Sequence, residues 1–401
     1  YNLELDGNIQ NLGLGGDWGD VGRQLHATGI WAMENRSVVI RNVYSHDHGL
    51  DGVQIGYHGL TAQDADAPHL LEDVRSEYNG RQGLSWVGGI GLTALRCKFN
   101  FTGRRRFFSP PAAGVDAEAE GSVCRKGVFV DCEFLDNYGQ GFVADTGDVE
   151  DVRLVRCRFA GTTNYSVWPN KPRIVFEDCD ISGGVAHTYG SHDSTRATKF
   201  LRCHFEDRAY LAGKPVYGVA VIEANGNNVL YEGCTIIANA SRALWIDEPG
   251  TREIIRDTVV IHRATSAGGT ALQPNEFQSL VRGSVLDGVE FREENLPSTA
   301  GPFYIDNAGA EIRGPIWVQG PRVHWGNASG PVGVIGGAAA VPYRLQRERA
   351  LYYGAAAPVE GAFSAGDVIF NRAAVAGGTA GWICVQGGSP GIWKAFGPIS
   401  T

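Results

Sequence analysis

The chain has 401 residues, with 35 basic and 44 acidic side chains, a formal net charge of −9 and 43% hydrophobic residues. No basic patch with interleaved aromatic residues occurs, so nucleic acid is not an expected partner. No apolar run approaches 18 residues, so we expect no insertion into a membrane. The composition is that of a globular protein in water.

The N-terminal part of the chain predicts strands and turns. Residues 1–30 read as a strand followed by a glycine-rich loop, and Val38–Tyr57 reads as two strands joined by a turn. That turn contains two histidines and an aspartate: His46, Asp47 and His48. Residues two apart in an extended segment point opposite ways, so we expect hydrogen bonding within the turn in preference to a zinc site. The turn at Asp51 is a candidate site only if the carboxylates named below do not carry the chemistry.

One motif recurs through the centre of the chain. It consists of an alternating strand over Val128–Phe134, a turn with Asn137 and two glycines, and a second alternating strand over Phe142–Asp145. Its most visible copies carry a cysteine two residues before an aromatic or aliphatic residue: Cys97, Cys132, Cys157, Cys179, Cys203 and Cys234. Related segments without cysteine extend the series to roughly ten copies over about 290 residues, a spacing typical of a solenoid.

The solenoid is expected to be a right-handed parallel β-helix of the all-β class. No segment has the 3.6-residue periodicity of a helix, and the leucine spacing of leucine-rich repeats is absent. Because the cysteines occupy one inward position of successive copies, we expect a buried, reduced ladder of thiols.

The motif VxxCxFxxNxGxG followed by a short strand resembles the pectate-lyase-like superfamily of β-helix proteins, which includes bacteriophage tailspike depolymerases. The resemblance covers about residues 1–330 and implies a polysaccharide partner and an extracellular, secreted or virion-surface location. It does not choose among polysaccharide lyases, glycoside hydrolases, epimerases and non-catalytic adhesins, because all share the fold.

The remaining sequence divides into two parts. Residues 331–351 read as a connector, and residues 352–401 read as a small C-terminal β-module that resembles modules found after β-helices in phage and bacterial surface proteins. Such modules cap the solenoid, join subunits or bind glycan. The exposed ends of a solenoid invite edge pairing, and with the resemblance to trimeric tailspikes this gives the expectation of a homotrimer.

Alternation within the second strand of each copy predicts an outward-facing ladder of polar and aromatic residues. Matching Val115 to Phe142 brings outward residues of successive copies into two columns on one face. The members are Asp116, Glu118, Asp145, Trp168, Asn170, His192, Trp245 and Asp247. Glu223 joins the column of Asp247 only if its register shifts by one residue. Carboxylates in adjacent turns repel unless a proton, cation or substrate offsets the repulsion. Because the tryptophans beside these acids can lie against sugar rings, we expect a glycan-binding groove on this face.

Three functions are open to this face. In hydrolysis, Glu118 and Asp145 act as the carboxyl pair with Asp116 as a further member, and no cofactor is needed. The groups that hold the sugar are Trp168, Asn170, His192, Trp245 and Asp247. In β-elimination or epimerisation of a uronic-acid polymer, the acids would hold Ca²⁺, although no clean copy of the arginine-centred lyase motifs occurs. A non-catalytic adhesin would need the tryptophans but no paired acids.

One basic run stands out. Arg104, Arg105 and Arg106 lie in the longest insertion of the repeat region. We expect this run to be a solvated loop rather than an anion clamp.

Overall fold

The computed structural model describes residues 2–13, 25, 27–161, 165–183, 187–207, 220–223, 226–247, 251–267, 270–271, 276–297, 299, 303–320, 323–325, 343–345, 349–361 and 363–401. Over these residues it contains strands and one short 3-10 helix, η1 (Ile9–Asn11), and no α-helix. None of the described elements is a helix with the length and apolarity needed to cross a bilayer. The chain divides into two compact units, Tyr1–Gly218 with Gly226–Val229, and Val219–Asn225 with Leu230–Thr401.

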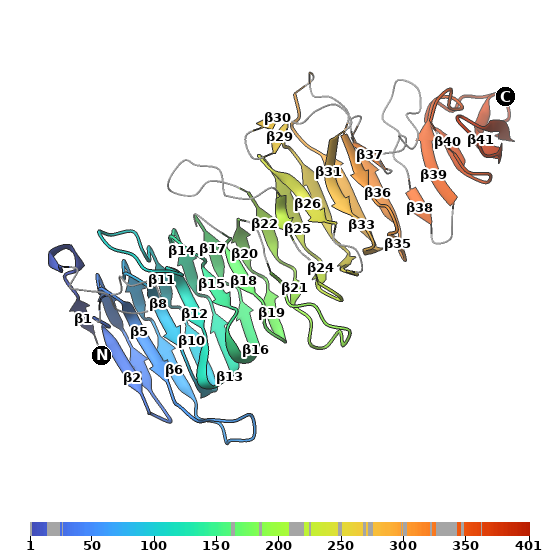
Figure 1. Ribbon diagram of the computed structural model, residues 1–401. Coiled ribbons are helices and arrows are strands. Elements are labelled where there is room, and N and C mark those ends of the chain that lie inside the picture. The colour runs from blue at the N-terminus through green and yellow to red at the C-terminus, as the bar shows by residue number, and fades with distance from the viewer. Residues whose placement is uncertain are drawn as a thin grey trace. The chain divides into compact units, whose positions relative to one another are not determined.

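The first unit is built from three parallel sheets that the chain visits in turn (Figure 1). Sheet A contains β1 (Leu3–Asp6), β4 (Val43–His46), β7 (Arg75–Glu77), β11 (Lys98–Asn100), β14 (Glu133–Leu135), β17 (Arg158–Ala160), β20 (Asp180–Ser182) and β22 (His204–Glu206). Sheet B contains β2 (Ile30–Met33), β5 (Asp51–Gly56), β8 (Gln82–Trp86), β12 (Ala113–Ala117), β15 (Phe142–Ala144) and β18 (Val167–Pro169). Sheet C contains β3 (Val39–Arg41), β6 (His69–Glu72), β10 (Leu92–Leu95), β13 (Ala119–Val130), β16 (Gly147–Val155), β19 (Ile174–Glu177) and β21 (Lys199–Leu201), with β9 (Gly89–Ile90) beside β13. This architecture is the predicted parallel β-helix.

The second unit repeats the three-sheet pattern and then adds the C-terminal module (Figure 1). One parallel stack holds β23 (Ala220–Glu223), β26 (Arg242–Ile246), β31 (Glu276–Val281), β34 (Phe303–Asp306) and β37 (Val323–Trp325). A second holds β24 (Leu230–Glu232), β27 (Ile254–Arg256), β32 (Val285–Asp287) and β35 (Glu311–Ile312). A third holds β25 (Thr235–Ala238), β28 (Val259–His262), β33 (Val289–Glu293) and β36 (Ile316–Gln319), and a separate antiparallel pair is formed by β29 (Ser266–Ala267) and β30 (Thr270–Ala271).

The C-terminal module begins earlier than predicted. Its strands are β38 (Tyr343–Leu345), β39 (Arg349–Gly354), β40 (Val368–Asn371), β41 (Thr379–Gln386) and β42 (Ile392–Pro398). β38 pairs antiparallel with both β36 and β39, so the expected connector over 331–351 contains strand, and a module boundary at 352 would cut β39. These strands were missed because the arginines of this segment interrupt the hydrophobic alternation from which strands are predicted. The module has its own small core, formed by Tyr352, Phe363, Ile369 and Cys384.

Each coil of the first unit has three strands where the sequence predicted two. The expected strand Val128–Phe134 is broken at Asp131, which has a left-handed backbone conformation (φ 54°) and turns the chain from sheet C into sheet A. Phe129, Cys132 and Phe134 all face the interior on either side of this corner. The corner interrupts the alternation, because Val130 and Asp131 both face outward between the buried Phe129 and Cys132, and the sequence analysis overlooked this interruption.

The same corner recurs with alternating charge. Successive coils place Asp73, Arg96, Asp131, Arg156, Asp178 and Arg202 there, all with φ between 49° and 54°. Arginine rarely adopts this conformation. Here each arginine donates two hydrogen bonds to the aspartate of the preceding coil, at 2.8 Å each for Arg96 and Asp73. The pairs Arg156–Asp131 and Arg202–Asp178 repeat this geometry. The guanidinium groups lower the pKa of the three exposed carboxyls.

The interior contains the predicted cysteine ladder. All eight cysteines of the chain are buried free thiols, including Cys384 in the C-terminal module. Aromatic residues pack beside the ladder; the rings of Phe134 and Phe159, for example, stack with centroids 4.4 Å apart. Burial raises the pKa of the Cys132 thiol well above its usual range. Because buried thiols are out of reach of reagents in water, these cysteines are expected to be inert.

This gives a first testable prediction. Dithionitrobenzoate should label none of the eight cysteines within minutes in the native protein, and all eight in concentrated guanidinium chloride, because the thiols are buried in the native state. The released chromophore and intact-protein mass spectrometry measure the labelling. Val39→Cys, at a residue that is 56% exposed, is the positive control. Rapid native labelling of a ladder cysteine would contradict the interior placement.

Candidate functional site

The outer face of sheet B carries a column of side chains in which each residue comes from a different coil. Strand register pairs Trp31 with Gln54, Gln54 with Ser85, Ser85 with Asp116, Asp116 with Val143, and Val143 with Trp168. We call these six residues the outer column. The neighbouring residues Val53, Leu84, Val115, Phe142 and Val167 are fully buried in the core, so alternation directs the outer column away from the core. The register of Asp116 beside Val143 is the one expected from the sequence.

A buried ion pair lies next to this column. Asp51 begins β5 and is fully buried, and Arg81, just before β8, donates from Nε and a terminal nitrogen to its two carboxylate oxygens at 2.9 and 2.6 Å. The following Gly52 is required, because a Cβ there would lie 1.9 Å from Ser76 Oγ in the interior. Gly52 therefore allows the tight corner at which β5 begins, and this corner positions the Asp51 side chain.

Gln82 links this corner to Asp116. Its side-chain Nε2 donates to Asp116 Oδ2 at 2.8 Å, and its Oε1 accepts from the backbone N–H of Ala113 at 3.2 Å. Both polar ends of the amide are therefore engaged. The arrangement holds the Asp116 carboxyl in one orientation between two coils.

Asp116 is protonated more readily than an ordinary aspartate. It is only 7% exposed, and burial raises its pKa to about 8, with further contributions in the same direction from Glu118, Asp51 and Glu120 and an opposing one from Arg81. Burial also raises the pKa of Asp51, although Arg81 opposes that shift. Asp116, a carboxyl with a raised pKa, is therefore combined with the carboxyl groups of Glu118 and Glu120 in its own coil and of Asp51 two coils away.

The other predicted acids lie at the ends of the same strands. Glu118 directly follows β12, is partly buried, and its backbone N–H donates to Trp86 at 3.0 Å. Asp145 directly follows β15 and is exposed. Asn170 follows β18 and donates from Nδ2 to Asp145 Oδ1 at 2.8 Å, so these two predicted residues are in contact.

His192 does not join this ladder, which corrects the sequence-based register. The backbone of Tyr189 still donates to Pro169, but residues 187–198 contain turns and no strand. Asp193 accepts hydrogen bonds from the backbone and side chain of Thr195, and such local bonds compete with a sheet ladder. His192 is exposed on this turn segment.

The predicted tryptophans differ in their surroundings. Trp168 ends the outer column, and one face of its indole stacks on His187 with ring centroids 3.9 Å apart. Trp245 lies on β26 in the second unit, where it pairs in register with Glu223 and its ring lies under the Arg242 guanidinium. Glu223 therefore shares the column of Trp245, and the register shift that would have placed it beside Asp247 is absent. Asp247 follows β26 and forms an ion pair with Arg282.

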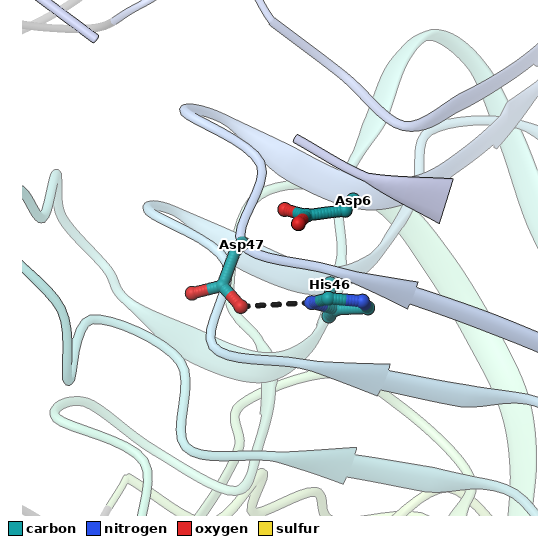
Figure 2. A group of neighbouring side chains, drawn as sticks. All are labelled: Asp6, His46 and Asp47. Atoms are coloured by element: carbon teal, nitrogen blue, oxygen red, sulfur yellow. Dashed lines mark hydrogen bonds and ion pairs between the residues drawn. The ribbon is translucent and has the colours of Figure 1, made fainter. Parts of the chain in front are cut away.

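The histidine turn forms a hydrogen-bonded network. Side-chain atoms of Asp6, His46 and Asp47 lie within 4.8 Å of one another, the kind of grouping that can hold a metal ion (Figure 2). Their hydrogen-bonding atoms are engaged, however. His46 Nδ1 contacts Asp47 Oδ2 at 2.8 Å and Nε2 contacts Glu4 at 3.1 Å, while Arg105 donates to the other Asp47 oxygen at 2.7 Å. A guanidinium on the carboxylate disfavours a second cation, so the network supports the expected hydrogen-bonding role.

The basic run lies in a loop of the long insertion, where Arg105 and Arg106 are exposed and Arg104 is partly buried. Arg104 donates to the backbone and carboxylate oxygens of Asp136 and to the carbonyl of Asn137. Arg105 binds Asp47 and lies over the Tyr78 ring, 3.9 Å from its centroid. These side chains satisfy carbonyl and carboxylate groups at the corner between sheets A and B. The run is therefore the exposed loop that the sequence predicts, and Arg104 and Arg105 in addition bind carboxylates at this corner, which the sequence did not indicate.

Sequence reasoning missed Arg81, Gln82 and Trp31, which belong to coils that lack the marker cysteine. A signal was present in the turn before each sheet B strand. Asn79-Gly80-Arg81-Gln82-Gly83 has the same asparagine-to-glycine spacing as Asn137-Tyr138-Gly139-Gln140-Gly141. Aligning on that spacing, with Gly52 as the third member, would have brought Asp51 and Gln82 into one column.

Comparison with known proteins assigns no family. No protein-family model and no curated protein matches the sequence. Among solved structures, the chain is similar to ORF18 of Geobacillus virus E2 (10% identity, TM-score 0.30, 98% of this chain and 75% of that one). It is also similar to PfbA, a surface adhesin of Streptococcus pneumoniae (8% identity, TM-score 0.24, 77% and 78% covered). A third is full-length QnrB1, a plasmid-mediated fluoroquinolone resistance protein (11% identity, TM-score 0.19, 71% and 93% covered).

Proposed function

We propose that the chain is a carbohydrate-active enzyme that hydrolyses glycosidic bonds of an extracellular or cell-surface polysaccharide at the outer face of sheet B. One observation carries the proposal. Asp116 is a largely buried carboxyl with its pKa raised to about 8, and Glu118, Glu120 and Asp51 lie close enough to contribute to that shift. Two carboxyl groups with different proton affinities are what glycoside hydrolysis requires.

The surroundings of each carboxyl group determine the role that we propose for it in catalysis. Asp116, protonated at neutral pH, is the general acid that donates its proton to the leaving glycosidic oxygen. Glu118 is the second carboxylate and acts as base or nucleophile. Gln82 orients Asp116, and the Asp51–Arg81 pair fixes the corner beside it.

The same residues fit calcium-dependent elimination poorly. Calcium binds ionised carboxylates and other oxygen ligands. Asp116 Oδ2 already accepts a hydrogen bond from Gln82, and both oxygens of Asp51 are bonded to Arg81. We therefore propose hydrolysis without a metal over lyase or epimerase activity. Membership of the pectate-lyase-like superfamily, a secreted or virion-surface location and a homotrimeric state form part of the same proposal.

The test is an assay of the whole chain against a panel of neutral, amino-sugar and uronic-acid polysaccharides from bacteria and plants. New reducing ends without absorbance near 235 nm are the expected result, because hydrolysis leaves no double bond. Absorbance that rises with the reducing ends would replace hydrolysis by elimination. Binding of a glycan without any cleavage would replace the enzyme by a glycan-binding protein.

A further inference from the structure

We infer that Gln140 is a positioning residue for Asp116: its side-chain oxygen accepts a hydrogen bond from one buried water molecule, which in turn accepts the proton of the Asp116 carboxyl group. The inference rests on the proposed role of Asp116 as general acid and adds how its proton is held. A protonated carboxyl group has one O–H donor, and a buried donor needs an acceptor. Gln82 cannot supply that acceptor, because its Nε2 donates to Asp116 and its Oε1 accepts from Ala113.

Gln140 occupies the position that matches Gln82 on the other side of the coil that carries Asp116. Strand register pairs Gln82 with Ala113. The register between β12 and β15 places Gln140 beside the same alanine, and the backbone N–H of Gly114 donates to the Gln140 carbonyl at 2.9 Å. The two glutamines therefore flank Asp116 from the two neighbouring coils, at the same offset along the strands.

The Gln140 side chain is buried outside the core, and its oxygen lacks a protein partner. The next residue, Gly141, faces the core, since a Cβ there would lie 2.9 Å from Phe159, so alternation directs Gln140 away from the core. Gln140 is 7% exposed, and within the described part of the chain its Oε1 is buried and makes no hydrogen bond. A buried carbonyl oxygen without a partner is costly, so it marks a place for a ligand that donates a hydrogen bond.

A water molecule is the ligand that fits both groups. Because Gln140 and Asp116 are both almost completely buried, the ligand has to be small. Water can accept from the acid and donate to the amide oxygen, and a buried water takes about two to four polar partners. Gln82 shows that a glutamine at this offset reaches Asp116, at 2.8 Å. One intervening water lengthens the reach that is available from Gln140.

The two glutamines are expected to act on the acid in opposite directions. Gln82 donates to the carboxyl oxygen and so favours the ionised form of Asp116. The water held by Gln140 accepts from the protonated form and so favours that form. Neither glutamine is ionisable, so replacing one of them with an apolar residue leaves the charges around the acid unchanged. The charged groups that act on the Asp116 carboxyl are Glu118, Glu120, Asp51 and Arg81.

The experiment titrates Asp116 in the whole chain. The infrared band of a protonated carboxyl group that is present in the parent and absent from Asp116→Asn gives the midpoint of its ionisation. We expect Gln140→Met, which removes the acceptor, to lower this midpoint by about one pH unit, and Gln82→Met to raise it by a similar amount. Gln63→Met, at an exposed glutamine, is the matched control and should leave the midpoint unchanged.

A conservative variant separates positioning from general damage to the site. Gln140→Glu keeps an oxygen acceptor and adds a negative charge, so it should raise the midpoint of Asp116. Loosening of the site would instead move both Gln140 variants in the same direction. If circular dichroism shows that Gln140→Met does not fold, Gln140→Glu gives the result. An unchanged midpoint in Gln140→Glu, or an unchanged or raised midpoint in Gln140→Met, would overturn the inference.

The midpoint is measured without substrate, so this test does not depend on the proposed function. In an active parent, the decline of turnover at high pH should move with the midpoint, downward in Gln140→Met and upward in Gln82→Met. If the midpoints shift as expected while the parent cleaves no glycan, or while the pH profile of turnover stays fixed, the hydrogen-bond role of Gln140 is upheld and the catalytic role of Asp116 fails.

Discussion

Replacing Asp116 with Asn is expected to lower turnover by about 10²-fold to 10⁴-fold and at the same time to stabilise the fold. The loss of turnover follows from removing a general acid. The gain in stability follows from burial: the native pKa of about 8 lies above the ordinary value of 3.8, so the native state holds its proton more tightly than the unfolded state. The free energy of unfolding of the parent therefore falls as pH rises between about 4 and 8.

Asparagine removes that pH-dependent penalty. Its amide oxygen can still accept the hydrogen bond from Gln82. At pH 7 the variant should be more stable by a few kcal/mol, on the order of 2 to 4, and the difference should vanish near pH 4. Urea denaturation at several pH values measures it. Asp145→Asn, at an exposed carboxylate, is the matched control and should change stability little.

The pH dependence of the parent's turnover should also report the protonation of Asp116. Turnover is expected to decline above about pH 8 as Asp116 loses its proton. Near-full activity of Asp116→Asn, together with an unchanged pH profile, would place the chemistry elsewhere. Lower stability of that variant at pH 7 would contradict the protonated state.

Replacing Arg81 with Met is expected to destabilise the fold by about 3 to 5 kcal/mol at neutral pH, the usual cost of leaving one member of a buried ion pair without its partner. Asp51 is fully buried and receives both hydrogen bonds from this one guanidinium. Because an orphaned buried carboxylate takes up a proton more readily, the loss should shrink as the pH falls. Chemical denaturation of the parent and the variant gives the difference.

Two further variants isolate the cause. Asp51→Asn combined with Arg81→Met should recover much of the lost stability, because neither charge then remains buried. Arg96→Met breaks a two-hydrogen-bond pair with Asp73 that is largely exposed and should cost far less stability than Arg81→Met. Equal losses in Arg81→Met and Arg96→Met, or no recovery in the double variant, would show that burial of Asp51 is not the source.

The fold was largely predictable because the side chains that fit the interior recur at similar intervals along the sequence. An interior position shared by successive coils requires a small apolar side chain, and the spacing of Cys97, Cys132 and Cys157 shows that requirement directly. The corner at Asp131 was missed although alternation carries a sign of it. Phe129 and Cys132 both face inward although they are three residues apart, which an uninterrupted strand does not allow, and the left-handed residue between them accounts for it.

The candidate site was predictable only where strand register decides it. Alternation sufficed to place Asp116 opposite Val143. It gave no sign of how deeply Asp116 is buried, and that burial, rather than its facing direction, separates it from Asp145 as a candidate acid. His192 was misplaced because its segment forms local turn hydrogen bonds in place of a strand.

The alternating aspartates and arginines at the corner between sheets C and A constrain how this solenoid can change its length in evolution. Each arginine pairs with the aspartate of the coil before it, as in Arg156 with Asp131. Loss of the single coil that carries Asp131 would set Arg96 beside Arg156, and like charges facing each other across adjacent strands are destabilising. Loss or duplication of two coils together preserves every pair. The segment of this part of the chain that can be lost or duplicated without breaking an ion pair is therefore the double coil.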